Sequence, residues 1–396
     1  MTYARARLWL GISGVGFWVW LALGGILLAT PARSFTPINP PAMSVGWNDW
    51  LALVQILFGY ILLSAPFDFL GGYWLPRVFL RLTPTLPRFL LAWLRGVLGQ
   101  ALIFLLTGAG ILLAGRAFGR LGAVGAVACM MLGLLLAQGW VARLIGGMRL
   151  AATDVSDAHR ILESWGLRAP ATTLLNATDP AFVGGFVGLP GYERLILPAS
   201  WGQGDSNGKR PGALAPEGLA LQIARRVGVL ERGSRRRGVW LALLWNLTGF
   251  YLATLLPKAG VTSVAELLTT ACGFTLWSFL GLLTLPSLSR PGVFEGDYFA
   301  AEKGVPRALI ERTIALLDQR QDDEPARSPL VETIFHPIPS VRSRLHQLTQ
   351  NSSEPRGAWQ AARVALFLSW TCWGFLSRAV HCNSGRPELW VLFPGD

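Results

Sequence analysis

The sequence has few charged residues for its length of 396 residues. Charged side chains make up 15% of the chain, against about 25% in an ordinary soluble domain, and hydrophobic side chains make up 52%. This balance excludes a disordered chain, a collagen-like chain and an ordinary cytosolic enzyme. It indicates an integral membrane protein that is mostly α-helical.

Cysteine and histidine are also scarce, with four of each. No two cysteines form a Cys-x-x-Cys pair, and three of them lie in apolar stretches, which excludes a disulfide framework and a cysteine zinc site. No two histidines stand three or four residues apart, as two zinc ligands on one helix would. We expect the buried cysteines to act as small hydrophobic side chains.

Acidic residues are fewer than basic ones, 23 against 35, and the net charge is +12. No nucleic-acid recognition motif accompanies this charge, so we expect no nucleic-acid partner. In a membrane protein, arginines hold cytoplasmic loops on the anionic side of the bilayer. We therefore expect membrane lipids to be partners.

Long uncharged stretches predict the membrane helices, because a bilayer core needs about 20 apolar residues of helix. Six stretches meet this requirement: 8–32, 50–67, 96–115, 121–142, 238–257 and 267–289. The first is predicted to be an uncleaved signal anchor, since it exceeds a typical signal-peptide core. A seventh stretch, 364–377, either spans with Arg363 and Arg378 extended outward or lies in the interface. We favour spanning.

The distribution of basic residues predicts the orientation. With the N-terminus in the cytoplasm, 28 Lys or Arg residues lie inside and 6 outside, and Arg378, His381 and Arg386 are on the outer side. The predicted location is a bacterial inner membrane, with the N-terminus and the soluble domain in the cytoplasm.

The spans divide the chain into a membrane part and a small α+β cytoplasmic domain. We predict a four-helix transmembrane region (1–146), a cytoplasmic domain in two segments (147–237 and 290–358), a transmembrane hairpin (238–289), and a C-terminal transmembrane or interfacial helix with a tail (359–396). In the cytoplasmic domain, periodicity predicts helices over 154–165, 217–230, 308–319 and 341–348, one or two helical turns over 295–303, and strands over 172–175 and 194–197. The glycine-rich segment 179–191 is expected to form a hairpin or an edge strand.

Four segments of this domain follow one another in a recognisable order. They are Asp179-Pro-Ala-Phe-Val-Gly-Gly with 193–198, the helix 217–229, the segment 294–304 and Phe335-His-Pro with Arg342 or Arg344. In this order, with a hairpin between the second and the third, they resemble the membrane zinc metallopeptidases of the CAAX prenyl protease and HtpX type (metallopeptidase family forty-eight).

The resemblance implies a role for each segment. The first is the edge strand beside the substrate cleft, which assigns peptide binding by strand addition to Phe182, Val183, Gly184 and Gly185. The helix 217–229 is the active-site helix. The segment 294–304 belongs to the part that carries the third zinc ligand, and its Glu295 and Asp297 are structural residues of the cleft. The fourth is the late His-Pro…Arg element, which places His336 and an arginine as structural residues of the cleft.

In this register every catalytic position is lost. Such a site needs two histidines at i and i+4, a glutamate between them as general base, and a distant glutamate as the third ligand. The histidines are replaced by Arg225 and Val229, and the general base by Arg226. The third ligand falls on Val293. We therefore expect no zinc, no other cofactor and no catalytic residue.

The two arginines have a second predicted role. Because a guanidinium binds a carboxylate well, we predict that Arg225 or Arg226 pairs with Asp297 or Glu295 in place of the metal. The alternative is that both arginines are solvated or lie along the membrane surface.

A further basic cluster, Arg235-Arg-Arg237, directly precedes the fifth predicted span. It acts as a topogenic signal, and it is also a candidate site for a phospholipid headgroup. Ionisable residues are nearly absent from the spans, which disfavours an ion-coupled transporter. Asn246 is expected to hydrogen-bond between helices.

Together these features predict a catalytically inactive relative of the family, a pseudopeptidase. It would bind a membrane protein or peptide partner, or act as a subunit or adaptor in a membrane complex. Two alternatives stay open at this stage: an active membrane zinc endopeptidase with an unrecognised site, and a transporter or lipid-handling protein.

Overall fold

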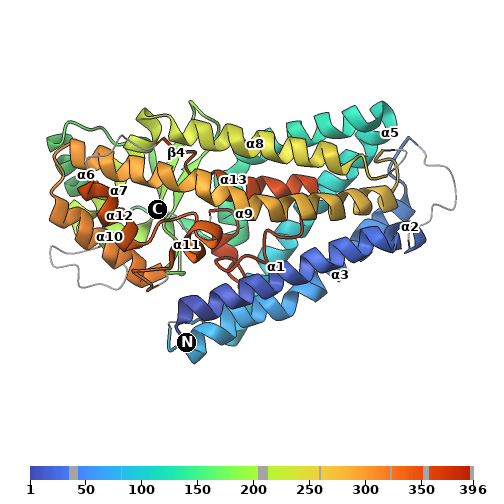
Figure 1. Cartoon of the computed structure of the whole chain (residues 1–396), viewed down its shortest axis with the longest axis horizontal. Helices are drawn as coiled ribbons and strands as arrows, with labels where there is room; N and C mark the ends of the chain where they lie inside the picture. The colour runs from blue at the N-terminus through green and yellow to red at the C-terminus, as the bar shows by residue number, and fades with distance from the viewer. Residues whose placement is uncertain are drawn as a thin grey trace.

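The structure, a computed structural model, describes residues 1–34, 43–81, 83–203, 213–257, 260–321, 323–350 and 356–392. It combines long helices with one small sheet (Figure 1). The helices are α1 (Tyr3–Leu27), α2 (Thr30–Ser34), α3 (Trp47–Phe69), α4 (Leu75–Val78), α5 (Leu86–Gly146), α6 (Ser156–Ser164), α7 (Pro216–Glu231), α8 (Ser234–Ala253), α9 (Val264–Glu302), α10 (Arg307–Gln321), α11 (Pro329–Phe335), α12 (Val341–Thr349) and α13 (Ala361–Leu368). The strands are β1 (Arg149–Leu150), β2 (Thr172–Asn176), β3 (Gly185–Val187) and β4 (Arg194–Pro198), and the short turns are η1 (Leu70–Trp74), η2 (Ala199–Gln203), η3 (Ser369–Cys372) and η4 (Pro387–Leu389).

Among the described residues, four helical stretches are long and apolar enough to cross a membrane: α1, the run from α3 to α4, α5 and α9. The chain is therefore an integral membrane protein. The third and fourth predicted spans both lie in α5, and α8 covers the fifth. The sixth span does not end where the sequence predicts. Instead α9 continues to Glu302, so that one helix carries both the span and the segment around Asp297.

Helix α5 is a hairpin of two helices joined at Gly119. This residue has φ 64° and ψ −157°, a conformation that only glycine adopts readily. The two halves then pack antiparallel: a Cβ added at Gly99 would lie 2.9 Å from Ile145, and one added at Gly110 would lie 3.3 Å from Met130. Gly119 thus lets this run of 61 residues fold back on itself.

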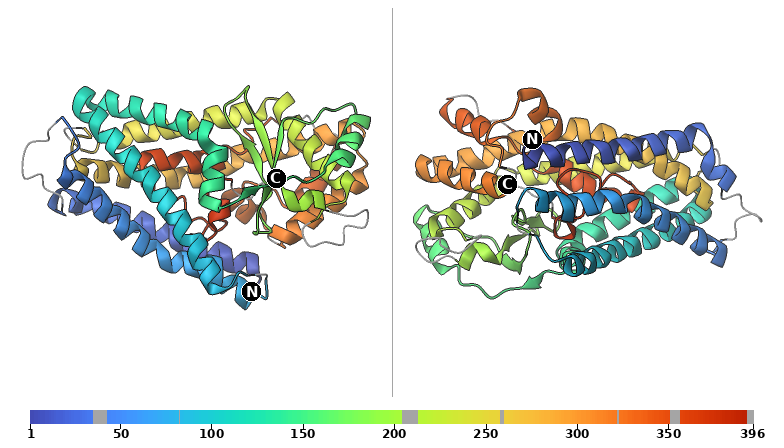
Figure 2. Two further views of the ribbon diagram at one scale, coloured as in Figure 1. Left: turned by 180° about the vertical axis from the view of Figure 1, so that it is seen from behind. Right: turned by 90° about the horizontal axis from the view of Figure 1, so that it is seen from below.

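The sheet has the order β1-β2-β4-β3, with β2 and β4 parallel and both outer pairs antiparallel. Successive residues of β4 face opposite sides. Leu195 and Leu197 pack in one buried cluster with Ile223 of α7, and Ile196 packs in another with Ile145 of α5. The sheet therefore lies between α7 and the end of the membrane hairpin (Figure 2).

The prediction that residues 364–377 span the membrane is wrong. Helix α13 has eight residues, about 12 Å of helix, and the chain leaves it through η3 and a reversal at Trp373, where φ is 58°. Almost every described residue from Gly357 to Leu392 is buried, and α13 contacts α5, α8 and α9 (Figure 1). Residues 356–392, hereafter the C-terminal segment, fill the space that the long helices enclose. Asn246 donates to the carbonyl of Ala365 at 3.0 Å, which confirms its predicted interhelical bond.

The C-terminal segment also returns to the side of the sheet. The ring of His381 lies 5.2 Å from that of His336, and Arg386 pairs with Asp179. The predicted placement of His381 and Arg386 across the membrane is therefore wrong. Arg378 lies inside the helix assembly, paired with the buried carboxylate of Asp68.

The N-terminus lies on this side as well. Arg5 pairs with Glu324 at 3.3 Å, and Arg81 donates to the carbonyl of Gln319 at 3.3 Å. The N-terminus, the α4–α5 loop and the sheet thus share one side of the membrane helices.

A glycine pair tests the hairpin of α5. At both Gly119 and Gly125 a Cβ would meet no atom within 4 Å, but only Gly119 has a positive φ. We expect Gly119→Ala to lower the free energy of unfolding by about 1–3 kcal/mol through backbone strain. Gly125→Ala, the matched control in a helix, is expected to be neutral or stabilising. Thermal unfolding in detergent micelles measures both, and an equal effect of the two would contradict the assignment.

Candidate functional site

Helix α7 passes through the centre of the sheet region. Pro216 stands at its start, where a missing backbone N–H costs nothing, and every residue from Gly218 to Val229 is buried. It crosses α9 closely, because a Cβ added at Gly228 would lie 2.5 Å from Phe299. One added at Gly296 would lie 3.1 Å from the backbone of Arg225. This crossing brings residues 225–229 of α7 against residues 293–297 of α9.

At the crossing, two guanidinium groups share one carboxylate. Arg225 Nε lies 2.6 Å from Asp297 Oδ1. Arg344 of α12 donates to both oxygens of Asp297, from Nε at 2.8 Å and from Nη2 at 2.7 Å. All three side chains are at most 6% exposed. The prediction that Arg225 or Arg226 pairs with Asp297 or Glu295 is confirmed for Arg225 and Asp297. Of Arg342 and Arg344, it is Arg344 that joins this pair.

Arg226, at the position of the general base, turns toward the sheet. It donates to the carbonyl of Val183 at 2.9 Å and to both oxygens of Gln222, and its guanidinium lies 5.5 Å from the ring centre of Trp201. Arg226 is 1% exposed. The alternative of solvated or membrane-surface arginines is therefore wrong for both residues.

The two remaining positions are filled by apolar packing. Val229 and Val293 belong to one buried cluster with Trp359 of the C-terminal segment. Zinc takes thiolate, imidazole and carboxylate ligands, whereas valine has no donor atom and a guanidinium stays protonated. These positions do not fit a zinc ion. Within the described ranges, no three His, Cys, Asp or Glu side chains form a group that could hold a metal.

Glu295, on α9 beside the ion-pair centre, fixes the start of the C-terminal segment. Its carboxylate accepts two bonds from Arg237, at 2.8 and 3.0 Å, and one from the backbone N–H of Gly357. Two residues further on, the backbone N–H of Trp359 donates to the carbonyl of Ser234 at the start of α8, at 3.1 Å. Trp359 of the C-terminal segment therefore packs among residues of α7, α9 and β3.

The prediction of a peptide-binding edge at residues 182–185 is wrong, because the C-terminal segment covers this edge. Phe182, Val183, Gly184 and Gly185 are all buried. A Cβ added at Gly185 would touch the side chain of Gln360. The carbonyls along this edge accept from arginines, that of Val183 from Arg226 and that of Phe186 from Arg235 at 3.3 Å. An external strand cannot pair here while the C-terminal segment is in place.

The three arginines of the basic cluster, residues 235–237, lie in different environments. Arg235 is 1% exposed and burial lowers its pKa to about 10, so for this residue a headgroup role is wrong. Arg237 forms an ion pair with Glu295. Arg236 is exposed, and its headgroup role stays a prediction. Arg342 is also exposed and lies outside the ion-pair centre, whereas His336 is buried beside His381.

A second clamp on the C-terminal segment has no local signal in the sequence. Arg386 pairs with Asp179, with Nε 2.7 Å from Oδ2, and Glu388 accepts the backbone N–H groups of Thr178 and Asp179 at 2.8 Å. Burial alone would raise the pKa of Asp179, but Arg386 holds it below its ordinary value. Burial raises the pKa of Glu388.

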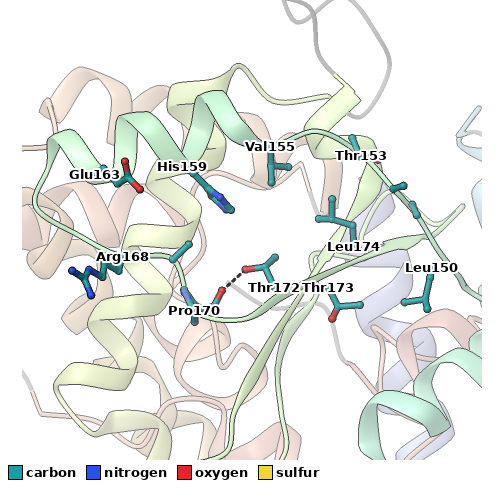
Figure 3. A pocket seen from close by; sticks show the side chains of 13 residues that line it. Leu150, Thr153, Val155, His159, Glu163, Arg168, Pro170, Thr172, Thr173 and Leu174 are labelled. Atoms are coloured by element: carbon teal, nitrogen blue, oxygen red, sulfur yellow. Dashed lines mark hydrogen bonds between the residues drawn. The ribbon is translucent and has the colours of Figure 1, made fainter.

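The opposite edge of the sheet is open. Both residues of β1 are exposed, and a groove of about 630 Å³ runs between β1–β2 and α6 (Figure 3). His159 and Glu163 lie on its α6 wall, and Thr172 and Thr173 lie on its strand wall. The free strand edge of this region is therefore β1.

Comparisons with known proteins agree with the fold. No protein-family model and no curated protein sequence matches the chain. Among solved structures, the chain is similar to Ste24p of S. mikatae, with a TM-score of 0.61 over 88% of this chain and 99% of that chain, at 13% sequence identity. Ste24p is a CAAX prenyl protease of the family whose motifs the sequence resembles. At this identity the similarity shows a common fold.

Removing the shared carboxylate tests the ion-pair centre. Asp297→Asn leaves two buried guanidinium groups without their counterion, and we expect it to cost about 3–5 kcal/mol of stability. Asp157→Asn removes an exposed partner of Arg160 and should cost less than about 1 kcal/mol. Denaturant unfolding in mixed micelles compares them. Equal stability of the two variants would contradict a buried centre.

The clamp at Asp179 predicts a pH dependence. Because its pKa is lowered in the fold, its contribution to stability is present above the ordinary Asp pKa of about 3.9 and is lost only as the pH falls through the lowered value. Hydrogen-exchange protection of residues 381–392 should therefore persist from pH 7 to pH 4.5. Asp179→Asn should lower it roughly tenfold at both values, whereas Asp323→Asn, at an exposed pair with Arg81, should not. Wild-type loss of protection by pH 4.5 would refute this account.

Proposed function

We propose that this protein is a catalytically inactive, metallopeptidase-like membrane protein that serves as a binding subunit or adaptor in a membrane complex. It would hold no zinc. The excess of basic residues on the side of the sheet region supports a bacterial inner membrane with that region in the cytoplasm.

One observation carries the proposal. The Asp297 carboxylate is saturated by Arg225 and Arg344, and Arg225 stands where the family register puts the first zinc ligand. Val229 and Val293, which stand where that register puts the other two ligands, pack in one buried cluster with Trp359. A metal-bound nucleophilic water would have no ligands from these side chains, which supports a fold that is kept without the chemistry.

The groove beside β1 is the surface that we propose for the partner, an extended peptide segment of another protein. A free strand edge offers unpaired backbone groups for strand addition, and a neighbouring groove accommodates alternate side chains. Leu150 is 60% exposed on this edge. The covered edge at β3 offers no such groups while residues 357–360 are in place.

The two alternatives have less support. An active peptidase needs a relocated donor set, and within the described residues none is present. For a transporter, the space inside the helices would have to be open, but three buried tryptophans of the C-terminal segment pack there: Trp370, Trp373 and Trp390.

Metal analysis separates the inactive protein from the active one. The purified full chain is expected to contain no stoichiometric zinc, and a chelator should leave its melting temperature unchanged. The variant Arg225→His/Val229→His/Val293→Glu restores the donor set and is the positive control. One tightly bound zinc per wild-type chain, with chelator-sensitive proteolysis, would favour the active peptidase.

Affinity purification tests the adaptor role. The full chain extracted from its native membrane is expected to retain a partner at fixed stoichiometry. Leu150→Asp should release it by placing a charge on the β1 edge, whereas Tyr192→Asp, at a residue 83% exposed between β3 and β4, should retain it. Retention by both variants would exclude β1 as the docking edge.

A further inference from the structure

The groove beside β1 contains a stretch of backbone that β1 does not cover. The two strands pair as far as Leu150 and Leu175, and the backbone N–H of Ala151 then donates to the carbonyl of Leu174 at 3.0 Å. Beyond Ala151, no other described strand pairs with this side of β2. The first residues of β2 therefore lie open along the line that β1 would follow.

Thr172 directs its backbone groups into this open stretch. Successive residues of a strand point their N–H and C=O groups to opposite sides. The carbonyl of Ala171 accepts from Leu195 of β4 at 2.9 Å, whereas that of Leu174 accepts from Ala151 on the β1 side. Thr172 is in phase with Leu174, so its N–H and C=O groups face the groove.

His159 of α6 lies over the same place. Leu174 packs in one buried cluster with Ala158 and Leu162, so α6 covers this face of β2. Thr172, two residues earlier, points its side chain to the same face. Figure 3 shows the ring of His159 directed into the groove. Its Nε2 is buried, and no described residue forms a hydrogen bond with that atom.

We propose that this groove binds an extended peptide segment in which a serine or threonine lies opposite Thr172 and hydrogen-bonds to His159. The segment continues the line of β1 and exchanges two backbone hydrogen bonds with Thr172. Its hydroxyl side chain points to α6, because residues directly opposite each other in an antiparallel pair share a face. The inference rests on the proposed binding role and specifies what the partner presents.

The chemistry of the groove selects a hydroxyl group. A neutral imidazole nitrogen either donates or accepts, and a hydroxyl group satisfies Nε2 in both tautomers because it can do either. Glu163 and Arg168 line the groove with opposite charges, so a charged side chain of neither sign is favoured. Leu150 and Val155 also line it and favour apolar neighbours of the hydroxyl residue.

The size of the groove fits a short extended segment. A strand residue takes about 160 Å³, given its rise, the strand spacing and the sheet separation, so the groove of about 630 Å³ accommodates about four residues.

Two fluorescent peptides test the side-chain contact. One is acetyl-Lys-Val-Ile-Thr-Val-Lys-amide, and the other has valine in place of threonine, which exchanges the hydroxyl group for a methyl group. Fluorescence anisotropy with the full chain in nanodiscs measures the Kd of each. We expect the threonine peptide to bind at least roughly fivefold more tightly. His159→Phe should abolish this preference, whereas His346→Phe, at an exposed histidine of α12, should keep it.

N-methylated forms of the threonine peptide test the backbone pairing. A methyl group on the threonine nitrogen removes the N–H that donates to Thr172 and should weaken binding roughly tenfold. A methyl group on the nitrogen of the next residue, whose N–H points away from β2, should leave the Kd within about twofold.

Four results would overturn the proposal. Equal binding of the two peptides to the wild-type chain, or a preference that survives His159→Phe, would reject the contact with His159. Equal effects of the two methyl groups would reject the pairing with Thr172, and absence of binding by both peptides would reject the site. A native partner retained in the affinity purification alongside any of these results would leave the adaptor role standing.

Discussion

The shared carboxylate of Asp297 is the constraint on which the sheet region depends. A buried ion pair contributes little net stability when it is intact, but removing one partner leaves an uncompensated charge. Arg225 comes from α7, Asp297 from α9 and Arg344 from α12, so one centre joins three helices that are far apart in sequence. A zinc ion would join ligands from two of these helices in the family register. Here a second guanidinium extends the link to the third.

The C-terminal segment depends on the same centre. Glu295, two residues before Asp297, accepts the backbone N–H of Gly357, and Trp359 packs in one buried cluster with Val229 and Val293. From there the segment turns into the membrane part and returns to the sheet at Arg386. One continuous piece of this chain therefore packs both against the ion-pair centre and between the long helices. An external partner is left with the surfaces that this piece does not cover.

The sequence predicted the local helices and strands well, but it did not predict how the C-terminal segment packs inside the structure. Periodicity identified α6, α7, α10 and α12. The family resemblance narrowed the ion pair to Arg225 or Arg226 with Asp297 or Glu295, and the structure has Arg225 with Asp297. Hydropathy failed at residues 364–377 because an apolar segment buried in protein has the same composition as one that faces lipid. Arg378 suggested an outward extension there, but it is paired inside with Asp68. The clamp of Arg386 on Asp179 joins residues 207 positions apart, which no local pattern reveals.

The most direct measurement is a cryo-electron microscopy map of the full chain in nanodiscs, at a resolution that shows side chains around Asp297. The account predicts continuous density from this carboxylate to Arg225 and Arg344, with the indole of Trp359 packed against Val229 and Val293. Density for an ion at bonding distance from α7 and α9, or residues 357–360 lying outside the cleft, would contradict it.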